Sequence, residues 1–272
     1  IAYANDEAWY RVGRATASRR SLNPVRRLRS TRPERAPLAE GVVVQDGEAV
    51  LAVDARPDRD PVLLLRAAAA AAQAGLRLSP YAVARLASES APLPEPWPIA
   101  ARDSLISLLG AGRAAIPVWE ALDQADLISR LIPEWKVVRS APQRNPVHRF
   151  TVDRHLVETA VNASSLTREV SRPDLLLVGA LLHDIGKGQA GDHTEVGVRI
   201  VSELAPRLGF DAQDSAVLVD MVAYHLLLPD TATRRDLADP ATAAAVAAAV
   251  KTPLVLELLD CLTRADAAAT GP

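Results

Sequence analysis

The second half of the chain is a series of apolar segments, each bounded by residues that start or stop helices. Pro173 supplies a first helical residue for a segment that runs to 185, and Gly186 supplies its stop. Asp192 and Glu195 have the spacing of a capping box ahead of the apolar stretch 196–208. Later helices are predicted to begin at Asp211, Asp239-Pro240 and Thr252-Pro253, and the last to reach residue 268. From about residue 145 onward the sequence therefore predicts an all-α domain.

The first half is predicted to be a mostly helical connector with one small β-hairpin. The turn dipeptide Asp46-Gly47, which suits positive φ, lies between the apolar stretches 42–44 and 48–53. Helices are predicted over 62–74, from Ser79-Pro80, and near 99–110 and 118–131, with prolines between them. We therefore expect a connector over 1–139 and a helical domain over 140–272. Because helical spacing starts at residue 6 and continues to residue 20, we also expect that the chain begins inside a larger protein.

Charge and cysteine content exclude several classes of protein. The formal net charge is −2, and no apolar run approaches the roughly 18 residues of a membrane span, so no membrane partner is expected. Residues 1–40 are rich in arginine, but no aromatic side chain lies between Arg11 and Arg35, which favours a solvated face over a nucleic-acid site. The lone Cys261 cannot form an internal disulfide and is most simply a small buried residue. With no signal-peptide layout at the N-terminus, the sequence favours a cytoplasmic protein.

The histidines point to a metal site in the second half. All five lie between residues 148 and 225, and His183-Asp184 follows directly on the apolar stretch 175–182. Burying an imidazole beside a carboxylate costs several kcal/mol unless each group has a partner. A divalent metal ion is the simplest partner, since nitrogen and carboxylate ligands suit Mn, Fe, Zn or Mg, whereas a satisfied core histidine is the plain alternative.

The order of these residues carries a resemblance. His155, His183-Asp-Ile-Gly-Lys-Gly188 and Asp266 are arranged like the His…His-Asp…Asp signature of the HD-domain metal-dependent phosphohydrolases. The resemblance implies that His155, His183, Asp184 and Asp266 bind one divalent metal, Mn or Mg before others. It also implies that His193 and His225 can help to hold a second metal, with Asp184 as the bridging ligand. An exposed position without a ligand role is the alternative for His193.

A closer resemblance covers nearly the whole chain. It rests on Gln143, His155 and the stretches 148–153, 183–188, 191–193, 225–227, 231–236 and 265–272, all in order. These are similar to the HD region of the bifunctional PII uridylyltransferase/uridylyl-removing enzyme family, and 38–134 resembles that family's connector. The family's nucleotidyltransferase domain and its glutamine-sensing ACT domains are not recognisable here. The resemblance implies an all-α HD bundle that removes a nucleotidyl group from the PII signalling protein in nitrogen regulation and releases UMP or AMP.

Roles for the remaining residues follow from that chemistry. Hydrolysis of a nucleotidyl-tyrosine phosphodiester needs an activated water and stabilisation of phosphate charge, for which Asp184 and Lys187 are the candidate catalytic residues. Arg234 and Arg235 are candidates for substrate binding, although an exposed ion pair near Asp236 explains them equally well. His148 is assigned to loop positioning or substrate binding rather than to the metal.

Two other functions remain open from the sequence. One is an HD phosphohydrolase that acts on a free nucleotide or a guanosine alarmone and needs no PII protein. The other is a regulatory scaffold whose metal site is structural or degenerate. The scaffold would fold and bind metal without hydrolysing a substrate, so metal binding alone does not separate it from an enzyme.

Overall fold

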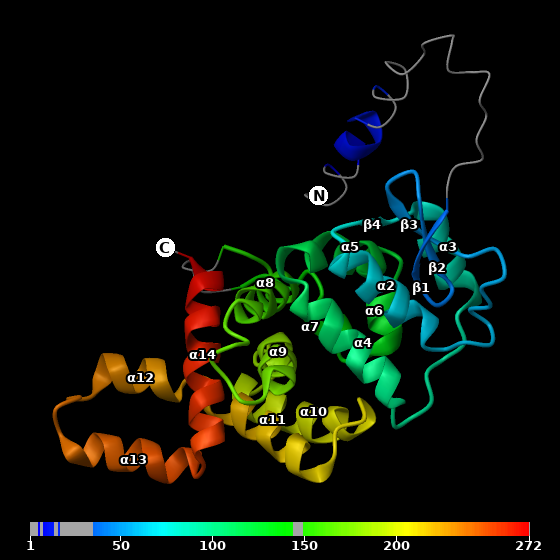
Figure 1. The fold of residues 1–272 in the computed structure, drawn as a ribbon. Helices are drawn as coiled ribbons and strands as arrows, with labels where there is room; N and C mark the ends of the chain where they lie inside the picture. The colour runs from blue at the N-terminus through cyan, green and yellow to red at the C-terminus, as the bar shows by residue number, and fades with distance from the viewer. Residues whose placement is uncertain (1–4, 6–7, 14–15, 17–34, 144–148, 272) are drawn as a thin grey trace, which may run out of the picture.

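The structure is a computed structural model that describes residues 5, 8–13, 16, 35–143 and 149–271 (Figure 1). Of the helix predicted over 6–20, residues 8–13 and 16 are described and are helical. Most of the arginines in 1–40 lie outside the described residues, as does His148. The rest is mostly helical with one small sheet, which confirms the predicted fold class. Within the described residues no single helix is long and apolar enough to span a membrane, although two sharply bent helix pairs reach that length and composition when joined.

The small sheet contains the predicted hairpin and two further strands. The strands are β1 (Ala36–Ala39), β2 (Val42–Gln45), β3 (Glu48–Leu51) and β4 (Arg77–Leu78). Asp46 and Gly47 both have positive φ, 53° and 78°, as a two-residue turn with right-handed strand twist requires. β1 pairs antiparallel with β2, and the two-residue β4 pairs parallel with β3. Neither outer strand was predicted, because such short strands carry no alternating pattern of their own.

The connector helices cover one side of the second half. They are α2 (Leu63–Gln73), α3 (Pro80–Glu89), α4 (Ile99–Gly110), α5 (Ala115–Gln124), α6 (Leu127–Leu131) and α7 (Trp135–Val138). The single helix predicted over 118–131 is wrong: the chain breaks at Asp126, whose φ is 60°, and α6 follows as a separate helix. Pro117 does not end a helix but lies in the first turn of α5, where a missing backbone N–H costs no hydrogen bond.

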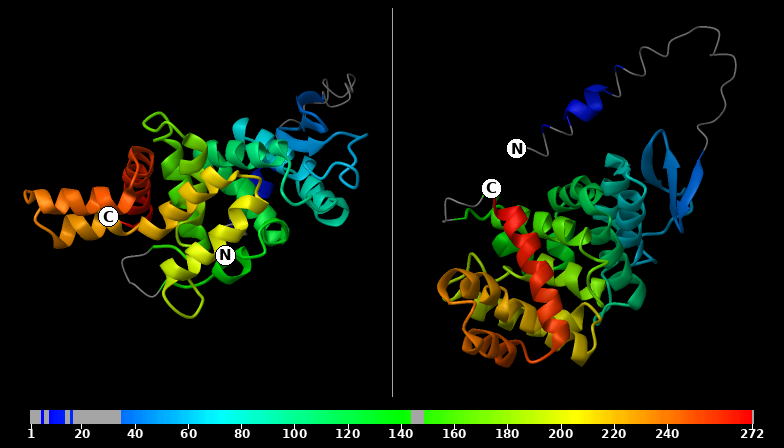
Figure 2. Two further views of the ribbon diagram at one scale, coloured as in Figure 1. Left: turned by 90° about the horizontal axis from the view of Figure 1, so that it is seen from below. Right: turned by 60° about the vertical axis from the view of Figure 1, so that its left-hand side comes forward.

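The second half is a helical bundle built around α9. Its helices are α8 (Val152–Ser164), α9 (Pro173–Leu182), α10 (His193–Arg207), α11 (Ala212–Tyr224), α12 (Leu227–Arg234), α13 (Pro240–Val250) and α14 (Pro253–Thr270). All eight residues from Leu175 to Leu182 are buried, because α8, α11, α14 and the connector helix α4 pack around α9. Figures 1 and 2 show α12 and α13 projecting from this bundle.

The helices start at the predicted caps, but α9 ends earlier than predicted. The side chains of Asp192, Asp211, Asp239 and Thr252 each accept a backbone N–H of the helix they precede. The helix predicted to continue to 185 ends at Leu182, so His183 and Asp184 lie in a turn instead of on a helix. α12 was not predicted. Cys261 is buried among apolar side chains, as predicted.

Candidate metal centre

Two histidines that each directly follow a helix face the same point in the bundle. His183 follows α9, and its Nδ1 donates to the Ala180 carbonyl at 2.9 Å. His225 follows α11, and its Nδ1 donates to the Val222 carbonyl at 2.7 Å. Since a carbonyl only accepts, both rings carry a proton on Nδ1 and turn Nε2, the nitrogen left for a metal ion, toward the interior. The carbonyls of two helix C-termini therefore fix the tautomer that a metal ligand requires.

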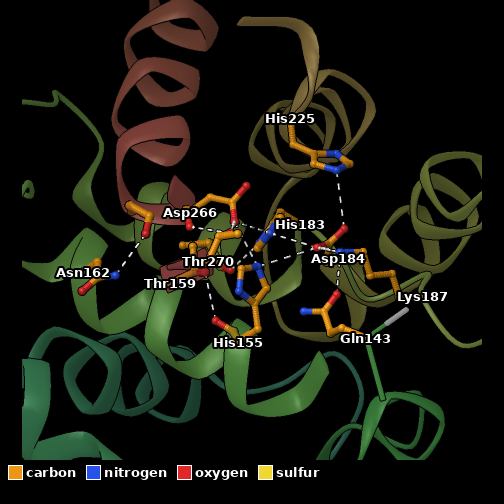
Figure 3. A network of polar contacts seen from close by, with 12 residues as sticks. Gln143, His155, Thr159, Asn162, His183, Asp184, Lys187, His225, Asp266 and Thr270 are labelled. Atoms are coloured by element: carbon orange, nitrogen blue, oxygen red, sulfur yellow. Dashed lines mark hydrogen bonds and ion pairs between the residues drawn. The ribbon is translucent and has the colours of Figure 1, made fainter. Parts of the chain in front are cut away.

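A first group of donors forms where α8, α9 and α14 meet (Figure 3). His155 Nε2 lies 3.0 Å from Asp266 Oδ1 and 3.8 Å from Asp184 Oδ2. His183 Nε2 lies 3.4 Å from the same Asp184 oxygen and 3.8 Å from Asp266 Oδ1. His155, His183 and Asp184 are each at least 97% buried. These four residues are the set that the sequence assigns to one metal.

A second group shares Asp184 with the first. His193, the first residue of α10, places Nε2 at 3.7 Å from Asp184 Oδ1, and His225 places Nε2 at 3.5 Å from the same oxygen. Asp184 therefore offers Oδ2 to one pair of histidines and Oδ1 to the other. Each trio of one shared aspartate and two histidines has ligand atoms close enough to hold a metal ion.

The residues present fit a bound divalent cation. His183 Nε2, His225 Nε2 and Asp184 Oδ1 are buried, yet within the described part of the chain none of them has a hydrogen-bond partner. A buried polar atom left in this state costs free energy, and here three such atoms face one another. Most of the nitrogen–oxygen separations, 3.4–3.8 Å, are too long for hydrogen bonds but suit atoms arranged around a common ion.

The charges of the cluster keep its carboxylates ionised. Burial acts to raise the pKa of Asp184, but His183, His225 and Lys187 outweigh it and hold that pKa well below its ordinary value. Asp266 behaves in the same way, with His155 and His183 lowering its pKa against burial. Burial lowers the pKa of His193, which favours the neutral ring that binds metals. Burial also acts on His183, but attraction by the Asp184 carboxylate raises its pKa to about 9.

Lys187 links the cluster to an open cavity. Its Nζ lies 2.5 Å from Asp184 Oδ2 and 3.1 Å from Gln143 Oε1. The cavity has a volume of about 680 Å³, and Asp184, His193, His225 and Asp266 reach it from the cluster. A ligand in this cavity can therefore meet the metal ligands and the Lys187 ammonium group together.

Glycine allows the His183-Asp184 turn to approach α10. A Cβ on Gly186 would lie 2.1 Å from the His193 carbonyl oxygen and 2.5 Å from the Gly197 nitrogen. Neither contact is possible for a larger residue, and both partners are backbone atoms that cannot rotate away. This close approach brings His193 beside Asp184.

The structure separates the predicted site residues into three sets. It brings together His155, His183, Asp184, Lys187, His193, His225 and Asp266. Arg234 is exposed and lies 3.4 Å from Asp230, and Arg235 is exposed at the end of α12; neither lines the cavity. His148 lies outside the described residues, so its role stays a prediction. Gln143 has no predicted role of its own, although it is the first of the residues on which the resemblance rests.

A buried His, His-Asp and Asp set between the helices of a bundle is the arrangement of an HD domain, and residues 152–270 match the HD domain family. The chain is 59% identical over 278 residues to the bifunctional uridylyltransferase/uridylyl-removing enzyme of Streptomyces coelicolor, covering 100% of this chain and 33% of the relative. It is 48% identical over 267 residues to that of Mycobacterium tuberculosis, covering 98% and 32%.

A third relative, from Corynebacterium glutamicum, is 39% identical over 240 residues, which cover 88% of this chain and 34% of the relative. Residues 152–270 belong to the HD domain family, and the chain is similar along its length to the HD-domain region of the bifunctional uridylyltransferase/uridylyl-removing enzymes, which confirms the resemblance seen in the sequence. It spans about a third of the length of these curated relatives.

Proposed function

We propose that this chain hydrolyses the phosphodiester that joins a nucleotidyl group to a tyrosine of the PII signalling protein, and that it uses Mn²⁺ or Mg²⁺. The observation that carries the proposal is the pair of His/Asp groups sharing Asp184 beside the cavity that Lys187 lines. The name of these relatives, uridylyl-removing enzyme, supports the reaction and its class of substrate.

The reaction adds water across one P–O bond. The oxygen of a water molecule bonds to phosphorus, the bond from phosphorus to the tyrosine oxygen breaks, and the products are a nucleoside monophosphate and free tyrosine. A divalent cation held by these residues would neutralise charge on the phosphate and lower the pKa of a bound water toward about 7. The nucleotide released is UMP or AMP.

The chain's own residues hold charge and protons at defined places. Asp184 is ionised and buried, so one of its oxygens can orient the attacking water or accept its proton. Lys187 places its ammonium group at the cavity, where it can stabilise negative charge on the phosphate oxygens. His193 is partly exposed beside the cavity, where its ring can accept the proton of the attacking water and pass it to the departing tyrosine oxygen.

Nucleotide release tests the proposal directly. Uridylyl-PII and adenylyl-PII are incubated separately with the chain and Mn²⁺ or Mg²⁺, and UMP and AMP are quantified. We expect metal-dependent release of one nucleotide, lost in Asp184→Ala and retained in the exposed connector control Arg59→Ala. Release from free nucleotides or an alarmone but from neither PII form would favour a small-molecule substrate. Metal binding without any release would favour a regulatory scaffold.

A further inference from the structure

Gln143 reaches the cavity from the connector side of the chain. The segment that carries it is held by backbone hydrogen bonds, from Ala141 N to the Val138 carbonyl at 3.0 Å and from Val152 N to the Ala141 carbonyl at 2.9 Å. Just before it, the Ser140 N–H donates to Asp153 Oδ2 at 2.8 Å. These contacts tie the segment to α7 and to the start of α8, so Gln143 has a defined position at the cavity wall.

Lys187 fixes the orientation of the Gln143 side-chain amide. A lysine ammonium group only donates hydrogen bonds, so the amide group that contacts it at 3.1 Å is the oxygen Oε1. The Nε2 group therefore points away from Lys187, as Figure 3 shows. It is buried and, within the described residues, has no hydrogen-bond partner. A buried N–H₂ group without an acceptor is destabilising, unless a ligand or water supplies one.

We propose that Gln143 is a substrate-binding residue whose Nε2 donates a hydrogen bond to a non-bridging oxygen of the substrate phosphate. The inference rests on the proposed function and assigns a phosphate-binding role within the same site. Gln143 and Lys187 both line the cavity, and the amide N–H₂ of one and the ammonium group of the other only donate. Phosphate oxygens only accept, and they carry the negative charge that Lys187 attracts.

The assignment extends the site beyond the HD domain itself. Gln143 precedes residue 152, where the match to the HD family begins, and Val137, Ala141 and Pro142 line the same cavity. The connector therefore supplies part of the phosphate-binding wall as well as support for the bundle.

Two substitutions separate phosphate binding from a role in merely holding Lys187. Gln143→Glu keeps an acceptor for Lys187 but removes the N–H₂ donor and adds a negative charge, whereas Gln143→Ala removes both. Binding of inorganic phosphate is measured by calorimetry on the Mn²⁺-loaded chain, with Gln213→Glu on the exposed face of α11 as the charge-matched control. Thermal unfolding of each variant verifies that it is folded.

We expect both Gln143 variants to bind phosphate about tenfold more weakly or worse, with no rescue in Gln143→Glu, and the control to bind as the wild type does. Wild-type affinity in Gln143→Glu would overturn the proposal and leave Gln143 as a positioning residue for Lys187. Wild-type affinity in both variants, or no phosphate binding by the parent chain, would also overturn it. The phosphate-binding measurement uses no PII protein. Its result can therefore be interpreted even if the chain fails to release a nucleotide from PII.

Discussion

At the scale of single residues, the centre depends on the orientation of a few polar atoms. Asp184 serves two pairs of histidines because its two oxygens face opposite groups. His183 and His225 can present Nε2 because backbone carbonyls take their Nδ1 protons. The sequence could indicate which residues are candidates, since the motif is contiguous around Asp184. It could not indicate the carbonyl contacts or the contact between Gln143 and Lys187, because those depend on where distant segments meet.

Metal binding should stabilise the folded chain through Asp184. A ligand present at a hundred times its dissociation constant adds about 2.7 kcal/mol to the free energy of unfolding. We expect saturating Mn²⁺ to raise the thermal midpoint of the wild type by several degrees and a chelator to reverse the rise. Asp184→Asn keeps the shape but loses the shared anionic ligand, so its midpoint should not respond. An equal Mn²⁺ response in Asp184→Asn, measured by differential scanning fluorimetry, would contradict the assignment.

At the scale of elements, helix starts follow from local sequence, whereas helix breaks and ends depend on tertiary contacts. The helix starts at Asp192, Asp211 and Thr252 were predictable because a cap needs only its neighbours in sequence. The break at Asp126 was not predictable from its neighbours. The Asp126 carboxylate contacts Arg139, which lies thirteen residues later in the chain. The early end of α9 also depends on long-range packing, through Gly186 against α10.

The contact between Gly186 and α10 predicts a sensitive position. Gly186→Ala places a methyl group against two backbone atoms of α10, and an overpacked site of this kind costs about 1–3 kcal/mol. We expect a lower free energy of unfolding in urea together with weaker Mn²⁺ binding, because His193 must move. Gly110→Ala is a control, since its φ is not positive and its added carbon would meet Leu177 at 3.5 Å, an ordinary contact distance. Unchanged metal affinity in Gly186→Ala would show that the turn does not position His193.

An ion-pair cluster that joins α9 to α11 gives a pH-dependent contribution to stability. Arg172 contacts both oxygens of Asp174 and both oxygens of Asp214 at 2.6–2.9 Å. Burial acts to raise the pKa of Asp174, but Arg172 outweighs it and lowers that pKa below the ordinary 3.8. A lowered carboxyl pKa stabilises the fold above about pH 4, and the contribution is lost as the pH falls through the folded-state value.

Asp174→Asn should therefore cost more stability at neutral than at acid pH. We expect its free energy of unfolding to lie about 0.5–1 kcal/mol below that of the wild type at pH 7, and the difference to shrink at pH 3. Urea unfolding at the two pH values measures it, with the exposed Asp103→Asn as the control. A difference that grows at pH 3 would mean that the sign of the linkage is wrong.

At the scale of the whole molecule, the connector and the bundle share one hydrophobic core. α4 packs on α8 and α9, and a Cβ on Gly110 would lie 3.5 Å from Leu177 of α9. Arg207 of α10 pairs with Glu134 at 2.6 Å, and its carbonyl accepts from Trp97 N at 2.8 Å. The cavity beside the metal centre is lined from both parts. The connector is therefore part of the environment in which the site forms.

Removing the connector should destabilise the bundle. A fragment of residues 149–272 exposes the faces of α8 and α9 that α4 covers and lacks Gln143. We expect a thermal midpoint at least about 10 °C lower than that of the full chain and increased binding of a hydrophobic dye. Circular dichroism and dye fluorescence measure both. A fragment as stable as the full chain would show that the bundle folds independently of the connector.

Anomalous diffraction from crystals of the chain grown with Mn²⁺ tests the account's central claim, that the buried His/Asp cluster is a metal centre. We predict an anomalous peak among His155, His183, Asp184 and Asp266, within about 2.0–2.2 Å of an Asp184 oxygen. A second peak beside His193 and His225 would show that Asp184 bridges two ions. An ordered cluster without any peak, in crystals that contain Mn²⁺, would contradict the claim.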